Sequence, residues 1–441
     1  MADGQAPPET RRHRSARPPL PQALAFWGTL AGICLIALNL RGPIVAPAPV
    51  LNLIRSDLEM SLQMSGLLTS LPVVCFGVVS FLAIPLLRRC GPDQAIAVCL
   101  AGILAGTFVR SAGGAELALA GTVIIGAAIT VGNVLVPVVI RRDFPPRRVP
   151  LVTGVYTAAL NIGSMLTLMV TAPLAGAMGW RAAVALWGVL ALMAAVAWLA
   201  LVGWRVFLLG QPAGERAARD AAAVAGTGTA AQIPAWRMPV AWILLLAFSG
   251  QAFAYYGVST WLPTLLADDL GLGLTAAGVG SSLFQGPAIA GALGVPLLAR
   301  RLRIRTLVII CAACWMTLPA GLILFPELWM VWVSLGGMAQ GAGITVIFLI
   351  MVRLGGSDRQ AGQLSALVQG GGYLVASLGP VVLGSLHEST GSWTWPLLAV
   401  LASSAVLGIA GTFGAGAAER RERLERLARS GAGSELPVRR S

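Results

Sequence analysis

One arginine, Arg41, lies inside a long run of apolar residues, where a charged side chain is costly. The run extends over residues 23–54. As a straight helix rising about 1.5 Å per residue, it would place Arg41 about 27 Å from one end and about 20 Å from the other. That position is near the middle of a bilayer core, and a charge at such depth indicates a functional group that needs a partner.

No acidic side chain is expected at the same depth. The 18 Asp and Glu residues fall in the tails, in a central connector, in loops or at helix ends. A buried guanidinium without a carboxylate partner favours an anionic ligand, which supplies the missing counter-charge through charge-assisted hydrogen bonds. The same pattern argues against a pump for cationic drugs, because such a pump would need an internal carboxylate.

A second interpretation of Arg41 stays open. If the first apolar span ended at Leu40, Arg41 would extend to the outer interface and the segment GPIVAPAPVLNLI would be a loop. That loop would expose an uncharged apolar stretch to water, so we favour the buried position. The three prolines of the segment would then interrupt the helix just past Arg41, as interrupted helices often do at transporter sites.

Uncharged polar side chains recur at comparable depth in both halves of the chain. Amides and phenols can orient a small polar or planar ligand through hydrogen bonds. Each alone is better explained as a bond between helices, but as a set they predict a modest polar cavity. The candidate substrate-binding residues are Arg41, Asn39, Asn133, Tyr156, Asn161, Gln251, Tyr255, Tyr256, Gln340, Gln369 and Tyr373, and Gln285 lies at similar depth.

The elements that must position these residues are membrane helices. Of the 441 residues, 56% are hydrophobic and only 11% are charged, whereas about 25% of a soluble globular chain is charged. With about 20 apolar residues per span, the sequence predicts an all-α membrane protein with twelve transmembrane helices. They cover residues 23–54, 62–87, 93–111, 115–140, 149–176, 181–204, 239–267, 275–299, 304–325, 327–351, 361–387 and 393–415.

Arginine placement predicts the orientation of these spans. All 31 basic residues are Arg, and nearly all fall in the tails and alternate loops of one side. Arg55, Arg110 and Arg181 fall on the other side. By the positive-inside rule both termini are cytoplasmic, and we expect a bacterial inner membrane. Orientation explains the net charge of +13 better than a nucleic-acid partner does.

The chain repeats itself at an offset of about 212 residues. SGLLTSL at 65–71 corresponds to AGVGSSL at 277–283. Two parallel six-helix halves are typical of transporters that bind substrate between the halves. The predicted organisation is a basic tail at 1–22, a bundle at 23–204, a linker at 205–238, a second bundle at 239–415 and a charged tail at 416–441.

The sequence carries no pattern typical of catalysis. An intramembrane enzyme would need a metal cluster, a nucleophile with its base, or paired carboxylates within the spans. Cys311 and Cys314 form a CxxC pair, but neither a second pair nor clustered histidines accompany it. We therefore expect no catalytic residue, no metal and no cofactor, and we expect a monomer whose partners are the bilayer and a small-molecule substrate.

Several distinctive strings are spread through most of the chain. They are LNLRGP at 38–43, GLLTSLPVVCFG at 66–77, GNVLVPVVIRRDFP at 132–145, TGVYTAALNIG at 153–163, WLPTLL at 261–266 and LSALVQGGGYLVASLGPVVLGSLHESTGSW at 364–393. In these strings the chain resembles the cyanate and 2-nitroimidazole transporters, a branch of the major facilitator superfamily.

The resemblance implies alternating access, in which two bundles rock about a central site. It makes Arg41, Gln369 and Tyr373 the leading binding candidates and implies secondary transport of a cyanate-like or short organic anion. Export of small neutral or aromatic compounds such as 2-nitroimidazole is the alternative. Arg88 stands where the superfamily's loop pattern has an Asp, so the resemblance implies no gating salt bridge at that position.

Overall fold

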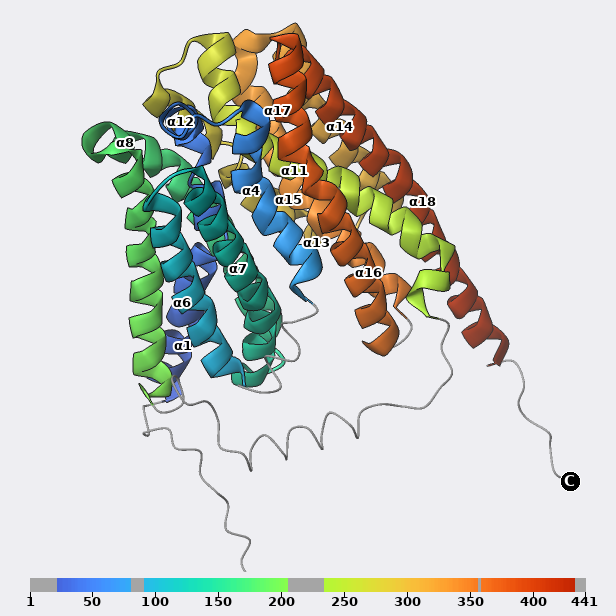
Figure 1. Ribbon diagram of the computed structural model, residues 1–441. Helices are drawn as coiled ribbons and strands as arrows, with labels where there is room; N and C mark the ends of the chain where they lie inside the picture. Colours follow the sequence, from blue (N-terminus) through green and yellow to red (C-terminus); the bar gives the residue numbers. More distant parts are fainter. Residues whose placement is uncertain (1–21, 81–90, 205–233, 356–357, 433–441) are drawn as a thin grey trace, which may run out of the picture.

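The computed structural model describes residues 22–80, 91–204, 234–355 and 358–432. Within these ranges the chain forms helices joined by short connections, and most of the helices run along one common direction (Figure 1). A backbone in lipid must satisfy its own N–H and C=O groups, and a helix does so within a single segment. Arg88 and the rest of the loop after the second span lie outside the described residues.

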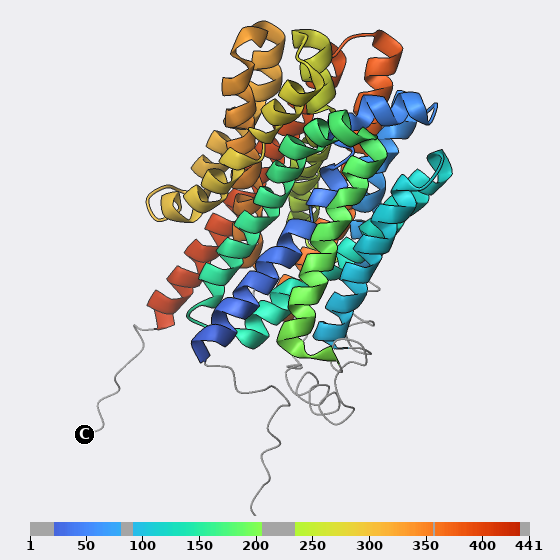
Figure 2. The same ribbon diagram turned by 90° about the vertical axis from the view of Figure 1, so that its left-hand side faces the viewer.

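The first half of the chain contains one helix that folds back on itself. α8 includes Gly179 with φ +81°, a conformation that glycine adopts without a steric penalty. Its two green segments run in opposite directions (Figure 2), so α8 supplies two of the expected spans. The elements of this half are α1 (Gln22–Asn39), α2 (Gly42–Val45), the 3-10 helix η1 (Ala48–Val50), α3 (Leu51–Asp57), α4 (Leu62–Val78), α6 (Pro92–Ser111), α7 (Ala115–Asp143) and α8 (Val149–Val202).

The second half of the chain contains two spans that are each built from two consecutive helices. These are α12 with α13, and α16 with α17. The elements are η2 (Ala235–Arg237), α11 (Pro239–Leu270), α12 (Leu274–Ser282), α13 (Gly286–Leu298), α14 (Ile304–Leu324), η3 (Pro326–Leu328), α15 (Trp329–Leu354), α16 (Asp358–Ala376), α17 (Leu378–Thr390) and α18 (Thr394–Ala432).

The predicted all-α membrane fold is confirmed. Ten helical segments of the described chain are long and apolar enough to cross a bilayer. One of them is the doubled α8, and Leu62–Val78 is a shorter apolar helix at the place of the second expected span. Each of the twelve expected ranges therefore contains a helix. The last helix continues to Ala432, beyond residue 415, where the sequence pattern placed the end of the span.

The first span is broken at Arg41. α1 ends at Asn39, Leu40 and Arg41 form a turn, and α2 begins at Gly42. The predicted interruption therefore starts before the first proline, Pro43, and includes Arg41 itself. A proline ring clashes with the carbonyl four residues earlier, which for Pro43 belongs to Asn39, and the break begins directly after that residue.

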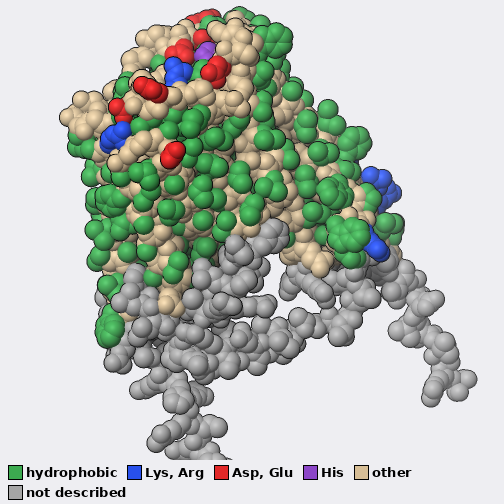
Figure 3. Space-filling view, in the orientation of Figure 1, with side chains coloured by type: hydrophobic (Ala, Val, Ile, Leu, Met, Phe, Trp, Pro, Cys, Tyr) green, Lys and Arg blue, Asp and Glu red, His purple; other side chains and the backbone are tan. Residues whose placement is uncertain are grey.

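The two halves contact each other at the end of the bundle away from residues 22 and 432 (Figure 1). There α4 packs on α17, and α8 packs on α12. The Gln63 backbone N–H donates to Glu388 Oε2 at 3.2 Å, and deeper along α4 Thr260 Oγ1 donates to Thr69 Oγ1 at 2.7 Å. Acidic side chains gather at this end of the surface (Figure 3). These contacts close this end of the interface between the halves.

Candidate substrate-binding site

Arg41 lies inside the bundle, and its guanidinium contacts the opposite half. Nη1 donates a hydrogen bond to the Tyr255 hydroxyl at 2.8 Å, and the guanidinium carbon is 4.9 Å from the centre of the Tyr255 ring. Tyr255 lies midway along α11. The Arg41 side chain is thus directed towards the middle of the bundle, as the favoured interpretation of the sequence expected, and not towards an outer interface.

All four tyrosines of the chain surround Arg41. Tyr255 on α11 contacts its guanidinium, and Tyr256 on the same helix, Tyr156 on α8 and Tyr373 on α16 lie near it. The ring centres of Tyr255 and Tyr256 are 4.8 Å apart, and those of Tyr256 and Tyr373 are 6.4 Å apart. Both separations are typical of edge-to-face aromatic contacts. Three helices from the two halves therefore build one phenolic wall around one cation.

Arg41 has no carboxylate partner within the described chain. Its charge faces hydroxyl groups and aromatic rings, which favour a cation but leave its formal charge uncompensated. The arginines that do form ion pairs lie elsewhere. Among the described residues these pairs include Arg142 with Asp93 and Asp143, Arg181 with Asp57, and Arg353 with Glu422.

Four of the candidate residues keep part of their surface accessible, whereas the other candidates are buried. These are Arg41, Asn133, Gln369 and Tyr373. Gln369 and Tyr373 are one turn apart on α16 and so share a face. Tyr156, which is 7% exposed, donates its hydroxyl to Asn133 Oδ1 at 3.5 Å. The structure thus places the four tyrosines near Arg41, with Asn133 bonded to Tyr156, whereas the Gln369 amide donates to Ser365 Oγ on its own helix.

A second polar cluster joins the halves through amide side chains. Gln340 Nε2 donates to Asn161 Oδ1 at 3.5 Å. Gln251 Nε2 donates to the Gln340 carbonyl at 2.9 Å, and Gln251 Oε1 accepts from Trp315 Nε1 at 2.8 Å. Both the nitrogen and the oxygen of the Gln251 amide are thus bonded to residues of its own half, Gln340 and Trp315. These three predicted residues come together, but as contacts between helices.

Asn39 and Gln285 are engaged within their own halves. Asn39 is fully buried, and its Nδ2 donates to the carbonyls of Leu35 at 2.8 Å and Leu190 at 3.1 Å. Gln285 is also buried and donates to Ser259 Oγ at 3.4 Å. The Asn39 amide therefore bonds α1 to the second segment of α8, and a role of either residue in substrate binding stays a prediction.

The sequence reasoning missed three phenylalanines that extend the phenolic wall. Phe76 and Phe248 lie 5.3 Å and 5.1 Å from the Tyr373 ring, and Phe284 stacks on Tyr255 at 6.1 Å. The available signal was helical spacing, because Phe248 and Tyr255 are seven residues apart and so lie on one face of α11. Phe76 and Phe284 carried no such signal.

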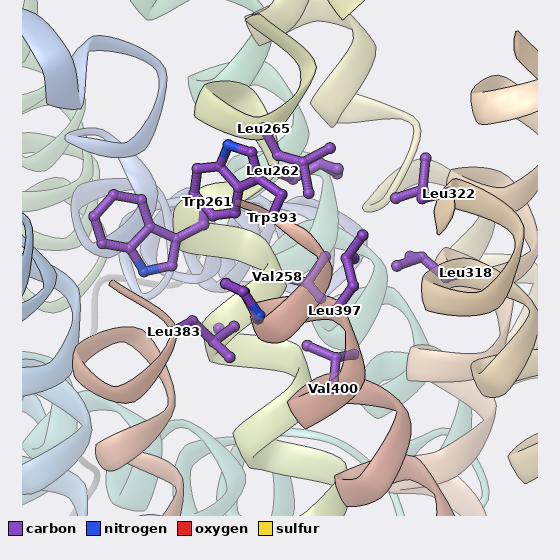
Figure 4. Close-up of a pocket in the computed structure, with 12 residues that line it drawn as sticks. Val258, Trp261, Leu262, Leu265, Leu318, Leu322, Leu383, Trp393, Leu397 and Val400 are labelled. Carbon is purple, nitrogen blue, oxygen red and sulfur yellow. The ribbon is translucent and has the colours of Figure 1, made fainter. Parts of the chain in front are cut away.

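The apolar cavity in Figure 4 is a packing void and not a ligand site. It lies between α11, α14, α17 and α18, and no candidate residue lines it. It has room for about one water molecule but an entirely apolar wall. The indoles beside it have other partners: Trp261 donates to the Pro380 carbonyl at 2.7 Å, and Trp393 donates to Asp268 at 3.2 Å. Among the described residues no group of three or more His, Cys, Asp or Glu could hold a metal ion.

Comparison with known proteins supports a transporter. Residues 29–354 match the family described as Major Facilitator Superfamily. The chain is 32% identical over 391 residues to the uncharacterized transporter YycB of Bacillus subtilis (strain 168), an alignment that covers 88% of this chain and 92% of that protein.

Two proteins of Escherichia coli (strain K12) are also similar along most of their length. The 2-nitroimidazole transporter is 32% identical over 382 residues, which cover 86% of this chain and 93% of that protein. The cyanate transport protein CynX is 28% identical over 378 residues, which cover 84% of this chain and 93% of that protein.

The fold itself is similar to a solved transporter structure. A crystal structure of a bacterial homologue of the human lysosomal transporter Spinster, inward-facing and occupied, superposes with a TM-score of 0.67 at 15% identity. The superposition covers 90% of this chain and 97% of that chain. This likeness concerns the fold alone.

Proposed function

Because the chain belongs to the major facilitator superfamily, we propose that it moves a small anion across the bacterial plasma membrane by alternating access. As a member of this family the chain is a multi-pass secondary transporter and not an enzyme. The proposed substrate is a cyanate-like or short organic anion, and Arg41 is its counter-charge.

The observation that carries this proposal is the environment of Arg41. Its guanidinium has hydroxyl and aromatic neighbours, and none of the described carboxylates pairs with it. A bound anion would balance the charge and accept hydrogen bonds from the fixed fork of the guanidinium. The phenolic wall beside Arg41 would in turn offer hydroxyl donors and ring faces to a planar anion. The similarity to a cyanate transport protein supports the same substrate class.

Export of a small aromatic compound such as 2-nitroimidazole is the second candidate. It is favoured by the number of rings near Arg41, since Phe76, Phe248 and Phe284 add to the four tyrosines. It is also supported by the similarity to a 2-nitroimidazole transporter. In this case Arg41 would donate to a neutral polar group, and its charge would contribute less to binding than the stacked rings do.

We further propose that both termini face the cytoplasm and that the transporter is a monomer. The described chain begins in α1 and ends in α18 at the same end of the bundle (Figure 1). Arg141, Arg142 and Arg148 lie at the ends of α7 and α8 that face this side. This arrangement supports the orientation expected from the positive-inside rule.

Transport by proteoliposomes tests the proposal. Vesicles preloaded with unlabelled cyanate, acetate, benzoate or 2-nitroimidazole are assayed for counterflow of the labelled compound. The variants are Arg41→Met, which removes the charge, and Arg41→Lys, which keeps it. An anion site requires counterflow of an anion that Arg41→Met abolishes and Arg41→Lys partly retains. Counterflow of 2-nitroimidazole alone, equal in the wild type and in Arg41→Met, would replace the anion proposal by the second candidate.

A further inference from the structure

Arg110 is a buried arginine that the proposed site does not use. It lies near the end of α6 and is 2% exposed. Its Nη1 donates to the Pro43 carbonyl at 2.6 Å, while its Nε and Nη2 have no hydrogen-bond partner among the described atoms. A buried guanidinium with one bond is costly. Its single hydrogen bond within the described chain, to the Pro43 carbonyl, therefore indicates its role.

The Pro43 carbonyl is an acceptor whose ordinary donor is missing. In an α-helix the carbonyl of residue i accepts from the N–H of residue i+4. For Pro43 that residue is Pro47, which has no N–H. The preceding bond of the same turn is made, from Ala46 N to the Gly42 carbonyl at 2.9 Å. Pro43 is buried, so without Arg110 its carbonyl would lack a partner inside the bundle.

The turn that contains Pro43 also carries Arg41. Arg41 is the residue just before α2, and its carbonyl accepts from Ile44 N at 3.1 Å and from Val45 N at 3.4 Å. Gly42 fits closely against α8, because a Cβ at this position would lie 2.8 Å from Thr167 Oγ1. These bonds and contacts join Arg41 and the Pro43 carbonyl in one compact unit.

We propose that Arg110 is a positioning residue for Arg41. It replaces the N–H that Pro47 lacks and so holds the broken first span in the geometry from which Arg41 reaches Tyr255. Its contribution to transport rests on the proposed function, but its effect on the position of Arg41 does not require a substrate. The two ideas can therefore fail separately.

Fluorine NMR on the full chain labelled with 3-fluorotyrosine tests the positioning role without a ligand. The chain has only four tyrosines, all near Arg41, and Tyr255 accepts a hydrogen bond from the guanidinium, so the Tyr255 resonance reports on its position. Tyr→Phe variants assign the four resonances. The spectrum of Arg41→Met then provides the reference for a site without the cation.

The variants compare loss of the donor with its restoration. In Arg110→Leu we expect the Tyr255 resonance to shift most of the way towards its position in Arg41→Met. In the double variant Arg110→Leu with Pro47→Ala, residue 47 regains an N–H, and the resonance should return close to its wild-type position. Arg110→Lys keeps a charged donor and should give an intermediate shift.

Arg181 offers a matched control. Its Nη1 also donates to main-chain carbonyls, those of Ser111 and Gly113, and its Nη2 pairs with Asp57 at the far end of the first span, but within the described chain it makes no bond to the turn that carries Arg41. Arg181→Leu should leave the Tyr255 resonance in place. An equal shift in Arg181→Leu and Arg110→Leu would show a general loosening of the bundle and would overturn the proposal.

Two further results would also overturn it. One is a wild-type spectrum for Arg110→Leu. The other is a double variant whose spectrum stays like that of Arg110→Leu. If Arg110→Leu alone does not fold, the proposal requires the double variant to fold, because its Pro43 carbonyl has a donor again. Absence of anion counterflow would overturn the proposed function and leave this result untouched.

Discussion

The hydrogen bond from Arg41 Nη1 to the Tyr255 hydroxyl, 2.8 Å long, joins the broken first span to the middle of α11 in the other half of the bundle. Alternating access moves the two halves relative to each other around a central site. This bond therefore belongs both to the proposed substrate site and to the contact between the two halves that move. An anion that binds Arg41 would also share the guanidinium with Tyr255.

Ligand-dependent stability should identify the substrate class. At about 100 times its dissociation constant, a ligand that binds the folded state alone stabilises by about 2.7 kcal/mol. We expect this stabilisation for a small anion with the wild type and its loss with Arg41→Met. Thermal unfolding in detergent, with chloride as the reference anion, measures it. Equal stabilisation of both proteins by 2-nitroimidazole only would speak for the second candidate.

Removal of the Tyr255 hydroxyl should weaken anion binding moderately. Tyr255→Phe keeps the ring under the guanidinium but removes the bond that orients Nη1. The loss of such a bond costs about 1 kcal/mol, or about a five-fold higher dissociation constant. Binding titrations measure the change, with Tyr255→Leu as the variant that also removes the ring and should lose more. An unchanged affinity in Tyr255→Leu would exclude Tyr255 from the site.

A larger residue at Gly66 should prevent closure of the end of the bundle away from residues 22 and 432. A Cβ there would lie 2.9 Å from the Pro380 carbonyl oxygen on α17, so the two halves could not approach to their present distance. Gly66→Val should abolish counterflow and make cysteines introduced between α4 and α17 reactive to a water-soluble thiol reagent. Gly154→Val is the control, since a Cβ at Gly154 meets no atom within 4 Å. Counterflow equal to that of the wild type in Gly66→Val would contradict the prediction.

The ion pair of Asp93 with Arg142 should matter more for stability than the pair of Asp57 with Arg181. Asp93 is 3% exposed and receives two bonds from Arg142, at 2.7 Å and 2.9 Å. Removing one partner of a buried pair costs about 3–5 kcal/mol, and the second carboxylate on Arg142, that of Asp143, should reduce this cost.

The comparison pairs Asp93→Asn with Asp57→Asn. The side chains of Asp57 and Arg181 are 47% and 41% exposed, and such a surface pair contributes about 0.2–1 kcal/mol. Thermal unfolding of the two variants measures the difference. A larger loss of stability in Asp57→Asn than in Asp93→Asn would show that burial does not govern these pairs.

The sequence by itself determined the membrane helices and the position of the charge inside them. Long apolar runs can only be helices in lipid, and the run around Arg41 contains no acid. The prolines after Arg41 predicted a broken span, and a clash that reaches four residues back explains why the break already begins at Leu40.

Only the tertiary structure decided which polar residues meet. Four tyrosines from three helices gather at Arg41, whereas Asn39, two residues before it, bonds to the second segment of α8. Hydrophobic periodicity could not tell these cases apart, because almost every face of a buried membrane helix is apolar. Likewise, the sequence indicated only that Arg110 lies on the outer side, and the fold showed that its guanidinium donates to the Pro43 carbonyl. A hydrogen bond forms only when its donor and acceptor lie within bonding distance. The packing of the helices decides which groups come that close.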